Sequence, residues 1–525
     1  MTDHSRKLAF AALIFASATV FSRVTGLGRE IVTAAIYGVG AEYNTLVSVS
    51  VIPNLIQQLV ADAAISAAFV PVFTALLTKG ERERAFQLAS NLLGLILVVV
   101  GGVVVLLMFA ADPLAHAIFP KLTQDAASRA LAADMLRILL PTVLLFSLAG
   151  AVSGVLYSLE RFTMPAVVSI VWNLTIIVMV LLFGSTMGVY AAAFGMLVGT
   201  LLQFGLLAAS MGHADRWLWP RFGLRDPLLR EVLLLMVPIT ITLGVLNFNA
   251  LIGTVFAQLV SDRAGAEIGY AFRLYQLPQG VFAVTIGTVL FPSLSRFALS
   301  REDGRFGDTV SFGVRQMVVV SLPFVAWFMV MPQAFVRLVY QRGRFDAEAT
   351  AEVALALAFM AVGLVFANAN IMLNRAFQSM HRPWLPFYVS LLNLAATVVL
   401  CWLLYRPFGV AGITLSMGLV SLVNFAALAV LLRRELGRLD GRRIVRTAAR
   451  AAVCTGGLAL VSGVLWRLLE GYAAAGFAEL LVATSVAVAG GGLVYVGLAR
   501  LLKLDELTAV WRALRRRRVR TVAGE

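Results

Sequence analysis

Long apolar stretches fill this chain, and short polar segments such as LTKGERER, FGSTMG and YRPFG separate them. A helix of about 20 apolar residues crosses the ~30 Å hydrocarbon core of a membrane. The pattern therefore predicts an all-α polytopic membrane protein with about fourteen spans. Their approximate ranges are 8–37, 43–78, 86–110, 130–158, 163–183, 187–211, 228–261, 267–295, 309–334, 350–378, 384–404, 409–432, 444–468 and 475–500.

Composition supports the membrane class. Of the 525 residues, 60% are hydrophobic and 14% are charged, and the mean hydropathy is +0.88, whereas about a quarter of the residues of a soluble domain are charged. The cysteines, Cys401 and Cys454, lie in apolar stretches, which does not indicate a disulfide framework. Arg6 and Lys7, followed by an apolar run and ASA, resemble a cleaved signal peptide. The run continues past ASA, which favours an uncleaved first helix.

The net charge of +15 is unevenly distributed. Most lysines and arginines fall in alternate loops and in the two chain ends, and the positive-inside rule assigns that side, with both termini, to the cytoplasm. The basic runs at 433–443 and 515–520 are explained by this topology and by contact with anionic membrane lipids. No nucleic-acid partner is expected.

An internal repeat divides the chain. Residues of spans 5 and 6 recur in spans 11 and 12 at one constant offset: Arg161, Pro165, Val168 and Ser169 match Arg382, Pro386, Val389 and Ser390, and Gly188 and Val189 match Gly409 and Val410. Two parallel six-helix lobes are a transporter design with a substrate site near the membrane midplane. We expect lobes at 1–215 and 216–435, two extra helices at 436–503, and a basic cytoplasmic tail at 504–525.

The stretch FSRVTGLGRE places charges inside the first apolar run. A charge near the bilayer centre costs at least ~2.5–3.5 kcal/mol. On a helix, Ser22, Gly26 and Arg29 share one stripe, and Arg23 and Glu30 share the next. These residues are expected to face a water-filled cavity. A structural Arg23–Glu30 pair and snorkelling to the interface are the alternatives.

Another arginine, Arg273, lies in the matching span of the other half, in YAFRLYQLPQG, with no carboxylate within four residues. A buried guanidinium is costly unless an anion pairs with it, and the planar fork of arginine suits phosphate. Arg23, Arg29 and Arg273 are therefore predicted to form an anion site where the halves meet.

Other polar residues within the spans are less specific. Asn54 and Gln57 in the second span and Gln276 beside Arg273 are candidate cavity residues, although interhelical hydrogen bonding also explains such amides. Asp62 is a candidate ion-coupling site, and pairing with a cavity arginine explains it equally well. The four histidines are scattered, and no phosphate-binding GxxxxGK[ST] stretch occurs. No metal and no cofactor are expected.

Several short motifs resemble the MurJ/MviN family of lipid II flippases, which belongs to the multidrug/oligosaccharidyl-lipid/polysaccharide exporter superfamily. They are SRV at 22–24, Gly26, RE at 29–30, IPNL at 52–55, AFVP at 68–71, GT at 287–288 and FPSLS at 291–295. The resemblance implies a flippase of the bacterial cytoplasmic membrane. Such a protein moves an undecaprenyl-pyrophosphate-linked peptidoglycan precursor to the outer leaflet by alternating access.

The resemblance also implies roles for particular residues. Arg23, Arg29 and Arg273 would engage the pyrophosphate, and the helices at 444–468 and 475–500 would form a groove for the lipid tail. Cell-wall synthesis proteins are candidate partners. The chain departs from the family at Gln57, where an arginine is common, and at Phe272 and Gln276, where acids are common. The coupling energy therefore stays open between membrane potential, a cation and an anion.

Other functions predict different residues. A flippase for another polyprenyl-linked oligosaccharide would share every feature above. A drug/cation antiporter of the same superfamily needs carboxylates in its cavity, where this chain has arginines. A membrane-embedded glycosyltransferase needs positioned acids, often with a metal, and a sizeable outer domain, whereas the longest outer loops, 111–129 and 335–349, are short. An enzyme is not expected.

Overall fold

The computed structural model describes residues 3–60, 63–212, 218–223, 226–300, 302–380, 382, 384–437, 440–504 and 506, and these residues form helices and connecting segments without any strand. Among them, eight helices are long and apolar enough to cross a membrane, and one bent helix pair adds a ninth. The predicted class, an all-α polytopic membrane protein, is confirmed. The count of fourteen spans and the parallel repeat stay predictions.

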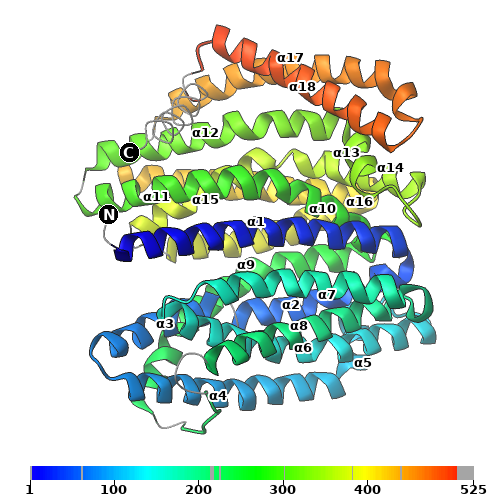
Figure 1. Cartoon of the computed structure of the whole chain (residues 1–525). Coiled ribbons are helices and arrows are strands. Elements are labelled where there is room, and N and C mark those ends of the chain that lie inside the picture. The colour runs from blue at the N-terminus through cyan, green and yellow to red at the C-terminus, as the bar shows by residue number, and fades with distance from the viewer. Residues whose placement is uncertain are drawn as a thin grey trace. The chain divides into compact units, whose positions relative to one another are not determined.

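The chain forms two compact units, one of residues 1–266 with 342–346 and one of residues 267–341 with 347–525. Figure 1 shows that both units consist of long helices. The helices of the first unit are α1 (Asp3–Tyr37), α2 (Ala41–Val60), α3 (Ala63–Thr78), α4 (Arg82–Phe109), α5 (Ala111–Ile118), α6 (Ala126–Ser158), α7 (Thr163–Met187), α8 (Tyr190–Met211) and α9 (Pro227–Ala257).

The second unit contains nearly all of α10 (Ala264–Pro278) and the elements that follow it. These are the π-helix η2 (Gln279–Ala283), α11 (Val284–Leu299), α12 (Asp303–Val330), α13 (Pro332–Tyr340), α14 (Ala347–Ala361), α15 (Leu364–Ser379), α16 (Trp384–Leu436), α17 (Gly441–Ala473) and α18 (Phe477–Leu501). Within this unit, α17 packs against both α18 and α12.

Several predicted spans are not single straight helices. The range 43–78 forms α2 and α3, and the range 267–295 is divided by η2. The break follows Pro278, whose missing N–H removes a helical hydrogen bond. The range 350–378 bends by 48° between α14 and α15. The two ranges within α16 meet at Gly409, whose φ of 55° lies in the left-handed region that glycine adopts readily.

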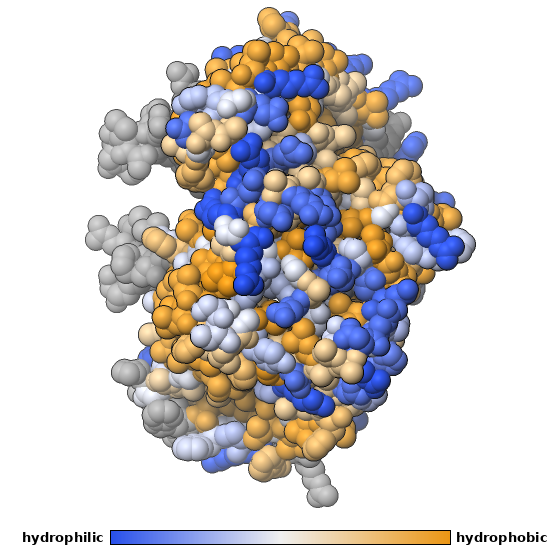
Figure 2. Space-filling view, turned by 90° about the vertical axis from the view of Figure 1, so that its right-hand side faces the viewer, coloured by the Kyte–Doolittle hydropathy of each residue, from blue (hydrophilic) through white to orange (hydrophobic). Residues whose placement is uncertain are grey.

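The surface matches a membrane environment. Long apolar side chains are exposed along the flanks of the helices, including Leu106, Leu182 and Leu468, where hydrocarbon would cover them. Figure 2 looks onto helix ends and shows hydrophilic residues gathered across the middle and the lower right of this face, with hydrophobic residues prominent at its upper and left edges.

Ion pairs hold segments outside the apolar helices. In the first unit, Arg129 donates two hydrogen bonds to the carboxylate of Asp112, of 2.7 and 2.6 Å, and these bonds lower the pKa of Asp112. In the second unit, Arg315 of α12 pairs with Glu506, and both side chains are buried. Thr447 of α17 also donates to Glu506. Glu506 therefore ties the segment after α18 to α12 and α17.

Candidate functional site

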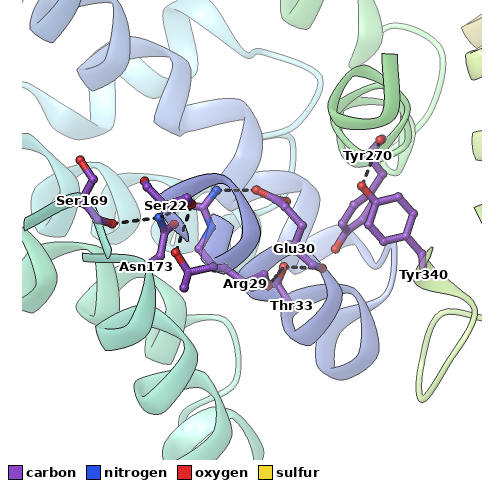
Figure 3. Close-up of polar contacts among 9 residues, drawn as sticks. Ser22, Arg29, Glu30, Thr33, Ser169, Asn173, Tyr270 and Tyr340 are labelled. Atoms are coloured by element: carbon purple, nitrogen blue, oxygen red, sulfur yellow. Dashed lines mark hydrogen bonds and ion pairs between the residues drawn. The ribbon is translucent and has the colours of Figure 1, made fainter. Parts of the chain in front are cut away.

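An arginine and a glutamate form a covered ion pair on α1. The Nη2 of Arg29 lies 2.5 Å from the Oε1 of Glu30 (Figure 3), and only 12% and 11% of the two side chains are exposed. The hydroxyl of Thr33 donates to the carbonyl oxygens of both residues, at 3.0 Å each. This part of the predicted cavity stretch therefore holds a fixed cation with a carboxylate beside it.

An indole ring covers the guanidinium of Arg29. Its Cζ lies 4.8 Å from the centroid of the Trp172 ring on α7, a cation–π distance. The Nε1 of Trp172 donates to the hydroxyl of Thr200 on α8, at 3.1 Å, and the Phe146 ring of α6 lies against Trp172 with the centroids 6.2 Å apart. Three helices thus position the face on which Arg29 rests.

Gly26 lies where α1 approaches α7. A Cβ at Gly26 would lie 3.8 Å from both amide atoms of Asn173. The Nδ2 of Asn173 donates to the carbonyl oxygen of Ser169 at 2.9 Å and reaches that of Ser22 at 3.5 Å (Figure 3). A buried asparagine therefore occupies the space beside the glycine and links the two helices.

Arg23 has a different environment from Arg29. Its side chain is exposed, whereas Ser22 and Gly26 are half-buried. Glu30 forms its recorded ion pair with Arg29, the next residue along the helix. The alternative of a structural Arg23–Glu30 pair stays a prediction.

The remaining candidates of the first unit lie on or after α2. Asn54 is exposed and Gln57 is half-buried, one turn apart on a helix that contains Pro53. Asp62 lies outside the described residues. The roles of these residues in a cavity stay predictions.

The second unit carries Arg273 on α10, with an exposed side chain, and Gln276, which is half-buried. The Phe272 and Tyr275 rings are stacked with centroids 6.0 Å apart. The buried Tyr270 contacts Tyr340, whose hydroxyl donates to the Tyr270 carbonyl oxygen at 3.4 Å (Figure 3).

The π-helix η2 begins directly after α10, behind Pro278. Single-turn π-helices occur frequently at functional sites. Arg273 lies six residues before this irregular segment of its span. Because Arg23 and Arg29 belong to the first unit and Arg273 to the second, the predicted joining of the three in one site stays a prediction.

Trp172, Asn173 and Thr200 surround Arg29 and Gly26, yet the sequence patterns above do not single them out. The available signal was the pair WN in the otherwise apolar run VVSIVWNLTIIV, since both residues carry polar groups that need partners when buried. Within the described part of the chain, no group of three His, Cys, Asp or Glu residues is placed to hold a metal ion.

Known proteins resemble this chain over most of its length. It is 26% identical over 519 residues to a probable lipid II flippase MurJ of Bdellovibrio bacteriovorus, covering 98% of each chain. It is 28% identical to the lipid II flippase MurJ of Burkholderia cenocepacia, covering 81% of this chain and 84% of that one.

Solved structures share the fold. A lipid II flippase MurJ in an inward-closed conformation matches with a TM-score of 0.78 and 19% identity, over 94% of this chain and all of that one. An inward-facing multidrug-resistance MATE transporter of the MOP superfamily matches with a TM-score of 0.67 and 14% identity, over 82% and 99%. The sequence profile described as lipid II flippase MurJ matches residues 33–487, and the chain therefore belongs to the MurJ family.

Proposed function

We propose that this protein is a lipid II flippase that moves the undecaprenyl-pyrophosphate-linked peptidoglycan precursor from the cytoplasmic to the outer leaflet. The observation that carries the proposal is the family match over residues 33–487. The protein works in the bacterial inner membrane with both termini in the cytoplasm, as the distribution of basic residues favours. Transport requires no enzymatic step.

The chemistry of Arg29 supports an anionic cargo. A guanidinium has five N–H donors in a planar fork, and the structure records one bond from the Nη2 of Arg29 to Glu30 while Trp172 covers one face. The other edges of the fork can bind a phosphate. Glu30 offsets part of this positive charge, and a pyrophosphate bound at the other edges would share Arg29 with Glu30.

Arg23 and Arg273 supply further cations. Both side chains are exposed, so a headgroup can reach them from the surrounding solvent. In this proposal the three arginines bind the pyrophosphate, and Ser22, Asn54, Gln57 and Gln276 line the same cavity. Asp62 is the proposed ion-coupling residue.

The remaining parts of the chain have proposed roles as well. Lobes at 1–215 and 216–435 alternate access around the headgroup, and the extra helices within 436–503 provide a groove for the lipid tail. The basic tail at 504–525 contacts anionic lipids of the cytoplasmic leaflet. Cell-wall synthesis proteins that make or use the precursor are the proposed partners.

Replacing the native flippase of a bacterium with this protein tests the proposal. Depletion of the native protein is combined with an assay for precursor on the outer leaflet. We expect the wild type to restore outer-leaflet precursor and Arg29→Ala to fail at equal membrane abundance. Arg230→Ala, an exposed arginine at the start of α9 in the same unit, is the matched control and should retain activity.

Two outcomes would contradict the proposal. A wild-type protein that reaches the membrane but restores no precursor would reject the flippase function. Full activity of Arg23→Ala, Arg29→Ala and Arg273→Ala would leave the flippase function standing and reject the arginine site.

A further inference from the structure

An open cavity of about 1500 Å³ lies within the second unit, where α12 and α17 begin and α16 ends. Beneath it, Phe306, Leu432 and Ile444 belong to one apolar cluster that packs the three helix ends together. The cavity is therefore bounded by elements that a shared core holds in place.

Opposite charges line different walls of this cavity. Asp303 and Asp308 come from α12, and Arg433, Arg442 and Arg446 come from the end of α16 and the start of α17. All five side chains are exposed. Within the described part of the chain, no hydrogen bond or ion pair is recorded for any of these five charged groups.

The sixth charged residue of the lining is already engaged. The Oδ1 of Asp440 accepts a hydrogen bond from the backbone nitrogen of Arg443, at 3.3 Å, as the N-cap of α17. The positive end of the α17 helix dipole also faces this region. The carboxylate of Asp440 offsets part of this positive potential, so the basic wall depends on its three arginines, and these come from different helices than the aspartates of α12.

The helices around the cavity favour a position at the level of the lipid headgroups. α12 and α17 are apolar enough to span a membrane, and their first turns are polar. Leu436 and Val445 belong to the lining. Val445 is exposed and begins a stripe that continues along α17 through Val453, Leu460 and Leu468, at the spacing of one helix face.

We propose that this cavity binds the headgroup of a zwitterionic phospholipid, with the phosphate on the arginines and an ammonium group on the aspartates. Arg433, Arg442 and Arg446 provide charge-assisted donors for phosphate. Asp303 and Asp308 accept from the ammonium, and the exposed stripe of α17 accommodates an acyl chain. Phosphatidylethanolamine has this arrangement of charges and can donate hydrogen bonds through its primary ammonium.

Simpler ligands fit the cavity less well. A purely anionic headgroup such as that of phosphatidylglycerol has no cationic group to pair with the two aspartates. A lone cation would be repelled by the three arginines. A ligand that carries both charges satisfies both walls. The headgroup site does not involve the arginines assigned to transport. Its acyl-chain stripe lies on a helix of the proposed lipid-tail groove, but the test measures retained phospholipid and not precursor transport, so the two proposals can fail separately.

Lipid retained by the full-length protein measures this binding. The protein is reconstituted in vesicles of equimolar phosphatidylethanolamine and phosphatidylglycerol, extracted in detergent, washed, and analysed by mass spectrometry. We expect the wild type to retain phosphatidylethanolamine in excess. Arg442→Gln combined with Arg446→Gln should lower its retention about tenfold, which corresponds to the loss of roughly one charge-assisted contact.

The acidic wall is tested by selectivity. Asp303→Asn combined with Asp308→Asn should remove the preference for phosphatidylethanolamine while phosphatidylglycerol is still retained. Arg450→Gln and Glu470→Gln change charges on α17 that do not line the cavity, and both should behave as the wild type. The thermal unfolding midpoint of each variant confirms that it is folded.

Three results would overturn the proposal. The first is equal retention of the two lipids by the wild type. The second is unchanged retention of phosphatidylethanolamine by the double arginine variant. The third is a loss of phosphatidylethanolamine from Arg450→Gln as large as that from the double arginine variant. The first result would mean that the protein carries only its annular lipid. A single Arg433→Gln variant provides a milder change if the double variant does not fold.

Discussion

Arg29 and Arg273 occupy apolar segments of the two sequence halves, yet their surroundings differ. Arg29 is almost fully covered, pairs with Glu30 and lies on the ring of Trp172. Arg273 is exposed, on a helix that gives way to a π-helix. Two arginines that both lie in apolar segments can therefore have very different surroundings.

The helices that carry the two arginines also differ, because one is continuous and the other is interrupted. α1 continues as one helix from Asp3 to Tyr37, through Gly26 and Gly28, whereas the span of Arg273 is divided into α10, η2 and α11. On the continuous helix α1, Trp172 of α7 covers Arg29. Arg273 lies six residues before an irregular segment, whose backbone can change the position of the arginine. We infer that Arg29 provides a fixed binding group and that Arg273 provides an adjustable one.

The largest expected effect follows from removing the fixed cation. Arg29→Gln takes the guanidinium from the covered carboxylate of Glu30, and removal of one member of a buried ion pair costs about 3–5 kcal/mol. Both the thermal unfolding midpoint and the outer-leaflet precursor should fall. Differential scanning fluorimetry of the purified protein and the precursor assay measure the two quantities.

A double variant separates stability from transport. In Arg29→Gln with Glu30→Gln, both charges of the pair are gone, so stability should recover part of the loss while transport stays absent. If transport recovered together with stability, Arg29 would be a structural residue. Arg29 and Arg273 could then no longer be compared as two groups that bind the headgroup.

The next effect concerns the adjustable cation. Arg273→Gln should reduce transport about tenfold, the value of one lost charge-assisted contact, with little change in unfolding midpoint because the side chain is exposed. Arg296→Gln, an exposed arginine on α11 that lies over Phe297, is the matched control for loss of charge. A large drop in the stability of Arg273→Gln would show that this arginine is as fixed as Arg29.

The sequence predicted part of this comparison. The all-α membrane class follows from apolar run lengths, because hydrocarbon thickness sets the length of a span. Arg29 and Arg273 were recognisable because a charge in an apolar run is costly. Both inferences depend on local sequence only.

The partners of Arg29 were not predictable in the same way. Helical stripes relate residues three, four or seven apart, so they favour Arg23 over Arg29 as the partner of Glu30. The structure instead joins two consecutive residues through their long side chains. Trp172 is far along the chain and conforms to the apolar pattern of its span, and only the packing of α7 against α1 brings it to Arg29.

Removal of the Trp172 ring that covers Arg29 should reduce transport less than removal of Arg29 itself. Trp172→Leu removes the cation–π contact, worth ~0.5–2 kcal/mol, and the hydrogen bond to Thr200. Transport should fall several-fold and remain above that of Arg29→Gln. Trp172→Phe, which keeps a ring but not the N–H, should lie between Trp172→Leu and the wild type. Trp219→Leu, at an exposed tryptophan of the same unit, controls for loss of an indole. Equal effects of Trp172→Leu and Trp219→Leu would remove Trp172 from the site.

The smallest effect tests how tightly the surroundings of Arg29 are packed. A Cβ at Gly26 would meet the Asn173 amide at 3.8 Å, an ordinary contact, whereas a Cβ at Gly199 would lie 3.0 Å from Trp172 Cδ1 and 3.2 Å from its carbonyl oxygen. Replacing a helical glycine by alanine otherwise stabilises by roughly 0.5–1 kcal/mol. Gly26→Ala should therefore raise the unfolding midpoint slightly, and Gly199→Ala should lower it and reduce transport because it displaces the indole. If both variants stabilised the protein equally, the Trp172 ring would be free to shift and would not hold Arg29 in place. Arg29 would then be as adjustable as Arg273.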